Sequence, residues 1–157
     1  MIKKLIILRH AKAEQDYAGA DHERALTGKG RKQAEAVGNR LAETGIVPDH
    51  VICSTSLRTR QTLELAMANL PVEPTVDFEE SAYGADPDTI LDLVQMTDPE
   101  VGTLMVVGHN PAMAQLASLF TGNGSLTSFP TASIAVVDLE VEWLYAAPGA
   151  GDGSILG

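Results

Sequence analysis

Two histidines and two arginines follow three short apolar runs of the sequence. Arg9 and His10 come directly after the first run, Arg58 lies shortly beyond the second, and His109 follows the third. Guanidinium groups bind phosphate oxygens through forked donors, and a neutral imidazole can act as a nucleophile toward phosphorus. These residue types at these places indicate an oxyanion site, most simply a phosphate site.

The chemistry that this set could perform is phosphoryl transfer. His10 would attack phosphorus in line, and the resulting phosphohistidine would then be hydrolysed. Arg9 and Arg58 would stabilise charge on the three equatorial oxygens and disfavour the imidazolium form of the nucleophile. His109 would donate to the transferred group from the opposite side. This chemistry calls for no metal and no cofactor, and the sequence shows no carboxylate cluster of the kind that holds two metal ions.

The elements that must position these residues alternate between strand and helix. Short apolar runs predict strands at 5–8, 51–53, 75–78 and 104–107. Capping residues predict helices that follow Thr27, the cluster Ser54 to Ser56, Asp86 and Asn110. Two final strands are predicted at 133–139 and 141–145, and antiparallel pairing is an alternative to parallel pairing for them.

Four strand–helix repeats predict a three-layer α/β/α sandwich with a largely parallel sheet. In such sheets ligands bind beyond the carboxyl ends of the strands, and helix N-termini there favour an anion. The residues after the three apolar runs, Asn110 included, are therefore expected to meet at one edge. With 157 residues, the chain is predicted to form one domain over 1–147, followed by a flexible Gly-rich tail over 148–157.

The overall charge and the single cysteine limit the partners and the location of the protein. The formal net charge of −10 argues against nucleic acid and against anionic membrane surfaces. Cys53 alone cannot form an internal disulfide or a Cys-rich zinc site. Arg9 cuts the first apolar run too short for a signal peptide, and no run is long enough to span a membrane. A cytoplasmic location is expected.

Three motifs in chain order resemble those of the histidine phosphatase (phosphoglycerate mutase-like) superfamily. They are Leu8-Arg9-His10-Ala11, Ser54-x-x-x-Arg58-x-x-Gln61-Thr62 and Val107-Gly108-His109-Asn110-Pro111. The resemblance covers about residues 2–145. The compact length and the motif Asp21-x-x-Arg24-x-Leu26-Thr27-x-x-Gly30 are further similar to the SixA-type phosphohistidine phosphatase subgroup.

The resemblance implies a phosphoglycerate mutase-like fold and a role for each motif residue. His10 would be the phosphorylated nucleophile, and Arg9, Arg58 and His109 would complete the phosphate pocket. Arg24 would be an additional phosphate contact, and Asn110 is expected beside His109 in the same pocket. Many members of the superfamily place a glutamate general acid between the second and third motifs. Glu80 is the candidate here, and a solvated loop carboxylate is the alternative.

The expected function is a metal-independent phosphatase acting on a phosphohistidine protein, with a small phosphorylated metabolite as the alternative substrate. A non-catalytic module that binds phosphate or a phosphoprotein is the alternative from another class. A mutase is disfavoured because the chain has no spare segment for a lid. A cysteine-dependent phosphatase is disfavoured because neither Arg58 nor Arg60 stands at the required spacing from Cys53.

Overall fold

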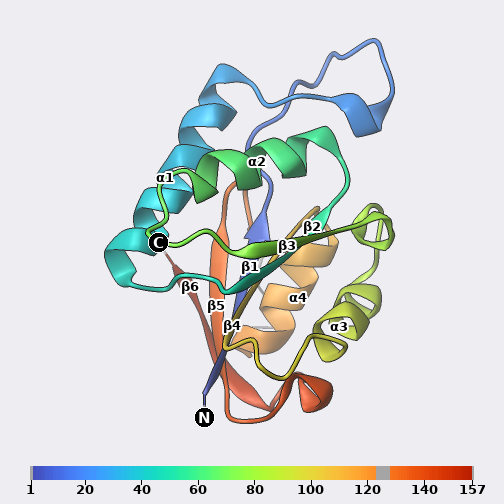
Figure 1. Ribbon diagram of the computed structural model, residues 1–157. Coiled ribbons are helices and arrows are strands. Elements are labelled where there is room, and N and C mark those ends of the chain that lie inside the picture. The colour runs from blue at the N-terminus through green and yellow to red at the C-terminus, as the bar shows by residue number, and fades with distance from the viewer. Residues whose placement is uncertain (1, 123–127, 157) are drawn as a thin grey trace.

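A six-stranded sheet forms the middle layer of the computed structural model, which describes residues 2–122 and 128–156 (Figure 1). The strands are β1 (Lys3–Arg9), β2 (His50–Ser54), β3 (Thr75–Glu79), β4 (Thr103–Gly108), β5 (Ile134–Leu139) and β6 (Gly151–Leu156), in the order β3-β2-β4-β1-β5-β6. The first four are parallel to one another, and β5 and β6 are antiparallel additions. The predicted α/β architecture with a largely parallel sheet is confirmed.

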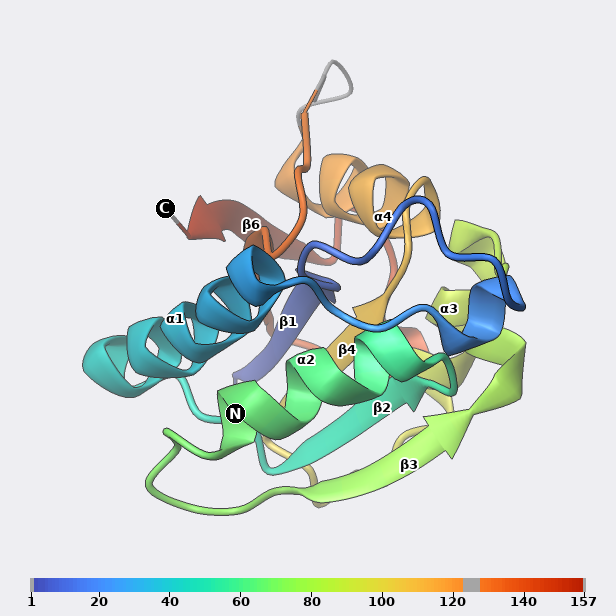
Figure 2. The ribbon, with the colours of Figure 1, turned by 90° about the horizontal axis from the view of Figure 1, so that it is seen from above.

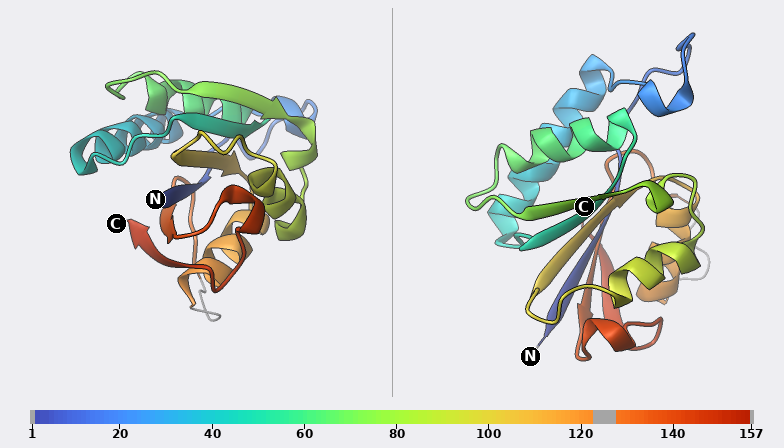
Figure 3. Two further views of the ribbon diagram at one scale, coloured as in Figure 1. Left: turned by 60° about the horizontal axis from the view of Figure 1, so that its bottom comes forward. Right: turned by 45° about the vertical axis from the view of Figure 1, so that its right-hand side comes forward.

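Helices cover both faces of the sheet (Figures 2 and 3). They are α1 (Gly28–Thr44) and α2 (Leu57–Met67) on one face, and α3 (Pro87–Gln95) and α4 (Ala112–Thr121) on the other. Side chains of β1 alternate between the two layers: Leu5 and Ile7 pack toward α3 and α4, whereas Ile6 and Leu8 pack toward α1 and α2. All four are fully buried, which explains why this strand is a continuous apolar run. Within the described ranges, no helix combines the length and the apolar character needed to cross a membrane.

Three of the four helices begin at the capping residues that the sequence predicts. The side chains of Thr27, Ser56 and Asp86 accept hydrogen bonds from the backbone N–H groups of the residues three positions later. At α4 the start is displaced by one residue, because Pro111 and not Asn110 occupies the N-cap position. The Asn110 carboxamide oxygen still accepts from the Ala114 N–H in the first turn, at 3.1 Å. Gly45 ends α1 with a left-handed φ of 72°, the conformation that a glycine favours.

The prediction of a flexible tail is wrong for Gly151–Leu156, which pairs with β5 as an edge strand. A Cβ on Gly151 would lie 2.1 Å from the Asp138 carbonyl oxygen, and one on Gly153 would lie 2.9 Å from that of Phe120. These glycines therefore allow a close approach of two backbones. Composition could not reveal this, because glycine is as typical of such an approach as it is of a mobile tail.

The prediction of a strand at 141–145 is also wrong. This segment instead contains a single turn of 3-10 helix, η3 (Trp143–Tyr145). Trp143 is almost fully buried and its indole N–H donates to the Val101 carbonyl at 2.7 Å, whereas Leu144 and Tyr145 are both largely exposed. Two neighbouring exposed apolar residues do not fit the alternation of a strand, and the buried indole fixes the turn.

Candidate active site

The carboxyl ends of β1, β2 and β4 lie side by side beneath the loop that leaves β1 (Figure 2). Arg9, the last residue of β1, is paired with Gly108, the last residue of β4. His10 and His109 therefore both lie just beyond the end of the sheet. A cavity of about 310 Å³ opens at this edge. It is lined by Arg9, His10, Lys12, Ala13, Gln15, Arg24, Arg58, His109, Asn110 and Thr131.

The His10 ring is held by its neighbour in the chain. Its Nδ1 lies 2.7 Å from the carbonyl oxygen of Ala11. A carbonyl can only accept, so Nδ1 carries the proton and Nε2 keeps its lone pair in the neutral ring. Burial lowers the pKa of His10 to about 4, helped by Arg58 and Arg9 and opposed by the hydrogen bond to Ala11. The imidazole is therefore neutral at pH 7.

His109 lies beside His10 in the cavity lining, with a ring-centroid distance of 5.4 Å and the two rings tilted by 56°. Its Nε2 lies 2.7 Å from the hydroxyl oxygen of Ser54. Burial, followed by the charge of Arg58, lowers the pKa of His109 to about 3. Both histidines thus remain uncharged beside a group of cationic side chains.

The three arginines of the cavity are fixed by different partners. Arg58 is almost fully buried, and its Nη1 and Nη2 donate to the backbone oxygen and the carboxylate of Asp21 at 2.9 and 3.1 Å. Arg24 donates from Nε to the same carboxylate at 2.9 Å. Arg9 donates from Nη1 to the carbonyl of Phe129 at 3.2 Å. Held in this way, the guanidinium groups lose little further freedom when they bind an anion.

Unpaired buried nitrogens gather at this cavity. In residues 2–122 and 128–156, the buried side-chain nitrogen and oxygen atoms without a hydrogen-bond partner are Nε of Arg9, Arg40 and Arg58 and Nδ1 of His109. Three of these four atoms belong to residues that line the cavity. Buried polar atoms are normally hydrogen-bonded, so the cavity offers the donor set that an anion requires.

The second motif also positions the loop that follows His10. The Thr62 hydroxyl accepts from the Ala11 N–H at 3.0 Å and donates to the carbonyl of Arg58 at 2.7 Å. The Gln61 carboxamide oxygen accepts from the Leu26 N–H at 2.8 Å. These two side chains tie the nucleophile candidate, Arg58 and the Arg24 segment into one network.

Asp21 and Tyr83 belong to this network, although neither is a predicted site residue. The Asp21 carboxylate joins Arg24 and Arg58 and accepts from the Tyr83 hydroxyl. The bond from Tyr83, followed by those from the arginines, holds the pKa of Asp21 well below its usual range. The Tyr83 ring makes T-shaped contacts with the rings of His22 and His109, at ring-centroid distances of 4.8 and 5.4 Å. Asp21 stood in a recognised motif, whereas nothing in the spacing pointed to Tyr83.

The two remaining predicted site residues, Glu80 and Asn110, differ in their surroundings, and the disfavoured Cys53 lies elsewhere. Glu80 is exposed at the start of η2 (Glu80–Ala82) and does not line the cavity. Asn110 lines the cavity, and its amide also donates to the Phe129 carbonyl at 2.9 Å. Cys53 is buried inside β2, and burial raises the pKa of its thiol to about 12. That thiol stays protonated at neutral pH and lies outside the cavity lining.

Over the described ranges, no group of three or more His, Cys, Asp or Glu side chains is placed to hold a metal ion.

Comparison with known proteins agrees with the resemblance of the motifs. Residues 5–100 match the profile of the histidine phosphatase superfamily (branch 1). An uncharacterised protein of Mycobacterium leprae is 33% identical over 151 residues, which cover 88% of this chain and 91% of that protein.

Two solved structures share this fold over most of the chain. A candidate phosphohistidine phosphatase SixA from Nakamurella multipartitia superposes with a TM-score of 0.85 at 29% identity, over 98% of this chain and 94% of that one. A second candidate SixA, from Agrobacterium tumefaciens, superposes with a TM-score of 0.81 at 31% identity, over 87% of this chain and 92% of that one. The profile covers more than half of the chain, and the fold and the motif order agree with it. This chain belongs to branch 1 of the histidine phosphatase superfamily.

Proposed function

We propose that this protein is a phosphatase that works through a phosphohistidine on His10. One observation carries the proposal: the bond from Nδ1 to Ala11 leaves Nε2 unprotonated on a residue that lines the same cavity as three arginines and a second histidine. Membership of the superfamily supports it.

In the proposed reaction the Nε2 lone pair attacks phosphorus and the bond from phosphorus to the leaving group breaks. The leaving group takes the electron pair and a proton from water. Arg9, Arg24 and Arg58 stabilise the charge on the equatorial oxygens. Water then attacks the phosphohistidine, the P–N bond breaks, and inorganic phosphate leaves while Nε2 recovers its lone pair. Arginines supply the positive charge throughout, so no step of the proposal requires a metal ion.

We propose a phosphohistidine protein as the substrate. No Asp or Glu of the described residues lines the cavity, so no carboxylic acid is at hand to protonate an alkoxide leaving group. A phosphorylated imidazole is a better leaving group and needs less help from an acid. The two solved structures at 29% and 31% identity, both candidate phosphohistidine phosphatases, support the same substrate.

The test is a brief incubation with ³²P-phosphohistidine peptide followed by quenching. We expect an acid-labile, alkali-stable label on His10. His10→Ala should remove the label and lower kcat by at least about 10⁴-fold, because the nucleophile is lost. His50→Ala is the matched control, since His50 bonds to Thr75 and Asp77 outside the cavity, and it should retain full activity. Activity should also survive EDTA.

Other outcomes would contradict the proposal in distinct ways. A label on Cys53, or a stable serine ester, would contradict His10 as the nucleophile. Phosphate binding without turnover of either phosphohistidine peptide or p-nitrophenyl phosphate would favour a non-catalytic module. A higher kcat/KM toward sugar phosphates or nucleotides would favour a small-molecule phosphomonoesterase.

A further inference from the structure

We infer that Ser54 is a positioning residue that fixes the tautomer of His109 with its proton on Nδ1. The inference rests on the proposed function, because it assigns the Nδ1–H group to the phosphoryl oxygens in the cavity. Ser54 does not line the cavity itself, and it acts through the imidazole that does.

The Ser54 hydroxyl has one acceptor for its proton. Ser54 is fully buried at the end of β2, and its Oγ lies 2.7 Å from Nε2 of His109. The Ser56 N–H, at 3.5 Å, is the other partner that the described residues provide for Oγ, and an N–H can only donate. The hydroxyl proton therefore points to Nε2.

An Nε2 atom that accepts a hydrogen bond leaves the ring proton on Nδ1. The ring is neutral at pH 7 because burial lowers the pKa of His109 to about 3, so it carries one proton only. Nδ1 is buried and has no partner within the described residues, and His109 lines the cavity. In this tautomer Nδ1–H donates to a phosphoryl oxygen. The opposite tautomer would turn a lone pair toward that oxygen, which is repulsive.

The strand register brings the two residues together. β2 and β4 are parallel neighbours, with Cys53 paired to Val107, so Ser54 and His109 follow at adjoining strand ends. The Thr59 hydroxyl donates to the Ser54 carbonyl at 2.8 Å and fixes the backbone at this point. Ser54 therefore reaches His109 from a rigid element, as a positioning residue must.

Two-bond ¹H–¹⁵N NMR of the full chain, labelled at its four histidines, tests the inference directly. Single histidine substitutions assign the signals. We expect His109 to be protonated on Nδ1 in the wild-type protein, and Ser54→Ala to shift it toward the Nε2–H tautomer. Ser54→Thr retains a hydroxyl and should restore the wild-type pattern.

The dissociation constant of inorganic phosphate supplies a second measurement. Ser54→Ala should raise it about tenfold, or about 1.4 kcal/mol, because the bond to a charged oxygen is weakened. Cys53→Ala is the matched control: it also removes one heavy atom from a fully buried side chain of β2, and the cysteine thiol donates to the Ser54 carbonyl rather than to His109. It should leave both the tautomer and the dissociation constant unchanged.

An Nε2–H tautomer in the wild-type protein would overturn the inference without the use of any variant. So would a Ser54→Ala protein with an unchanged tautomer and unchanged phosphate affinity. Both measurements are made without turnover. A missing phosphoenzyme would therefore refute the proposed function. The tautomer of His109 tests only the role of Ser54 and does not depend on that result.

Discussion

At the scale of single residues, the site depends on two imidazoles that stay neutral among cations. Burial is the largest cause for both His10 and His109, and the arginine charges add to it. A histidine in an unfolded chain takes up a proton near pH 6.5, whereas burial lowers the pKa of these two to about 4 and about 3. Between those values the unfolded chain binds more protons than the folded protein.

This difference predicts how stability depends on pH. As pH falls from about 6.5 to about 4, each of the two histidines should lower the free energy of unfolding by up to about 1.4 kcal/mol per pH unit. Urea unfolding at several pH values measures this slope. His109→Gln should make the slope shallower, and an unchanged slope in that variant would contradict the neutral, buried ring.

At the scale of elements, the loop after β1 depends on the start of α1. The Thr27 N–H donates to the Lys12 carbonyl at 2.9 Å, and Gly30 packs against the same carbonyl. Lys12 and Ala13 line the cavity, so this contact sets the position of one cavity wall. A glycine is required at position 30 because a Cβ there would lie 2.0 Å from the Lys12 oxygen.

Gly30→Ala should therefore be costly in both stability and activity. We expect the free energy of unfolding to fall by about 1–3 kcal/mol, because the backbone of the loop must shift to relieve the overlap. The value of kcat/KM should fall with it. Gly28→Ala is the control in the same turn of α1: its Cβ would meet nothing within 4 Å, and alanine favours a helix. Equal unfolding curves for the two variants would refute the role of this contact.

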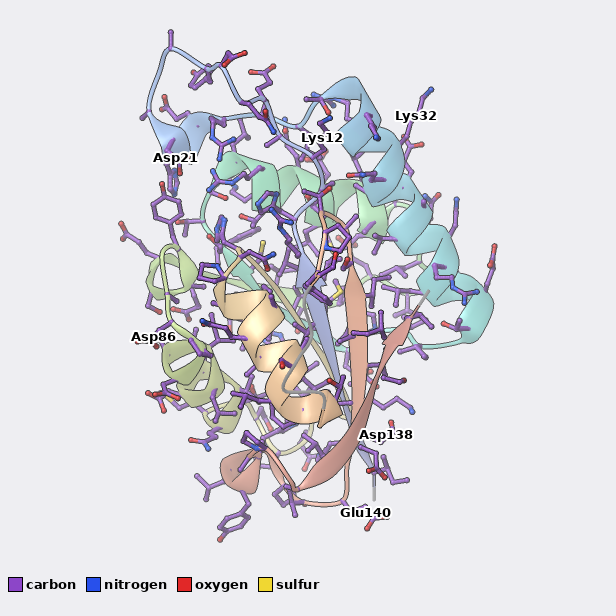
Figure 4. All side chains as sticks on the ribbon, turned by 180° about the vertical axis from the view of Figure 1, so that it is seen from behind. Lys12, Asp21, Lys32, Asp86, Asp138 and Glu140 are labelled. Atoms are coloured by element: carbon purple, nitrogen blue, oxygen red, sulfur yellow. The ribbon has the colours of Figure 1, made fainter. Side chains whose placement is uncertain are left out.

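At the scale of the whole molecule, the protein is strongly negative, yet three of its arginines lie at a single cavity. The net charge is −10, yet Arg9, Arg24 and Arg58 line a single cavity. Lys12 and Asp21 mark that end in Figure 4, whereas Asp138 and Glu140 lie at the opposite end. An anionic substrate is therefore repelled at long range and bound by short-range contacts.

Salt should therefore help, or at least not hinder, the encounter with an anionic phosphoprotein. The Debye length falls from about 30 Å at about 0.01 M salt to about 8 Å at about 0.15 M, which screens the long-range repulsion more than the contacts inside the cavity. We expect kcat/KM to stay level or to rise across that range, as measured by initial rates. A steep fall would contradict this distribution of charge.

Much of this structure could be predicted from the sequence because it depends on local chemistry. Buried strands require apolar runs, caps require short polar side chains, and residues that follow parallel strands meet at one edge. These rules bring Arg9, His10, Arg58, His109 and Asn110 to one edge, and all five line the cavity. The family resemblance added Arg24, which also lines the cavity, and Glu80, which does not.

The remaining features depend on contacts between distant segments. Tyr83 reaches Asp21 only because η2 and the loop after β1 approach each other in space, and no spacing in the sequence encodes that approach. The role of Ser54 likewise follows from the register of β2 against β4. The strand Gly151–Leu156 was missed because glycine also permits close backbone contact.

The place of β1 in the sheet has a consequence for synthesis on the ribosome. β1 carries Arg9 and leads directly to His10, yet both of its neighbours, β4 and β5, begin only at Thr103 and Ile134. The nascent chain must therefore expose an unpaired apolar strand until much of the protein has been translated, and then close a long loop to pair it. Arg9 and His10 are synthesised before the other residues of the cavity, whereas β1 can pair with β4 only after Gly108 has been made. Molecular chaperones that shield apolar segments should matter most for this protein during that interval.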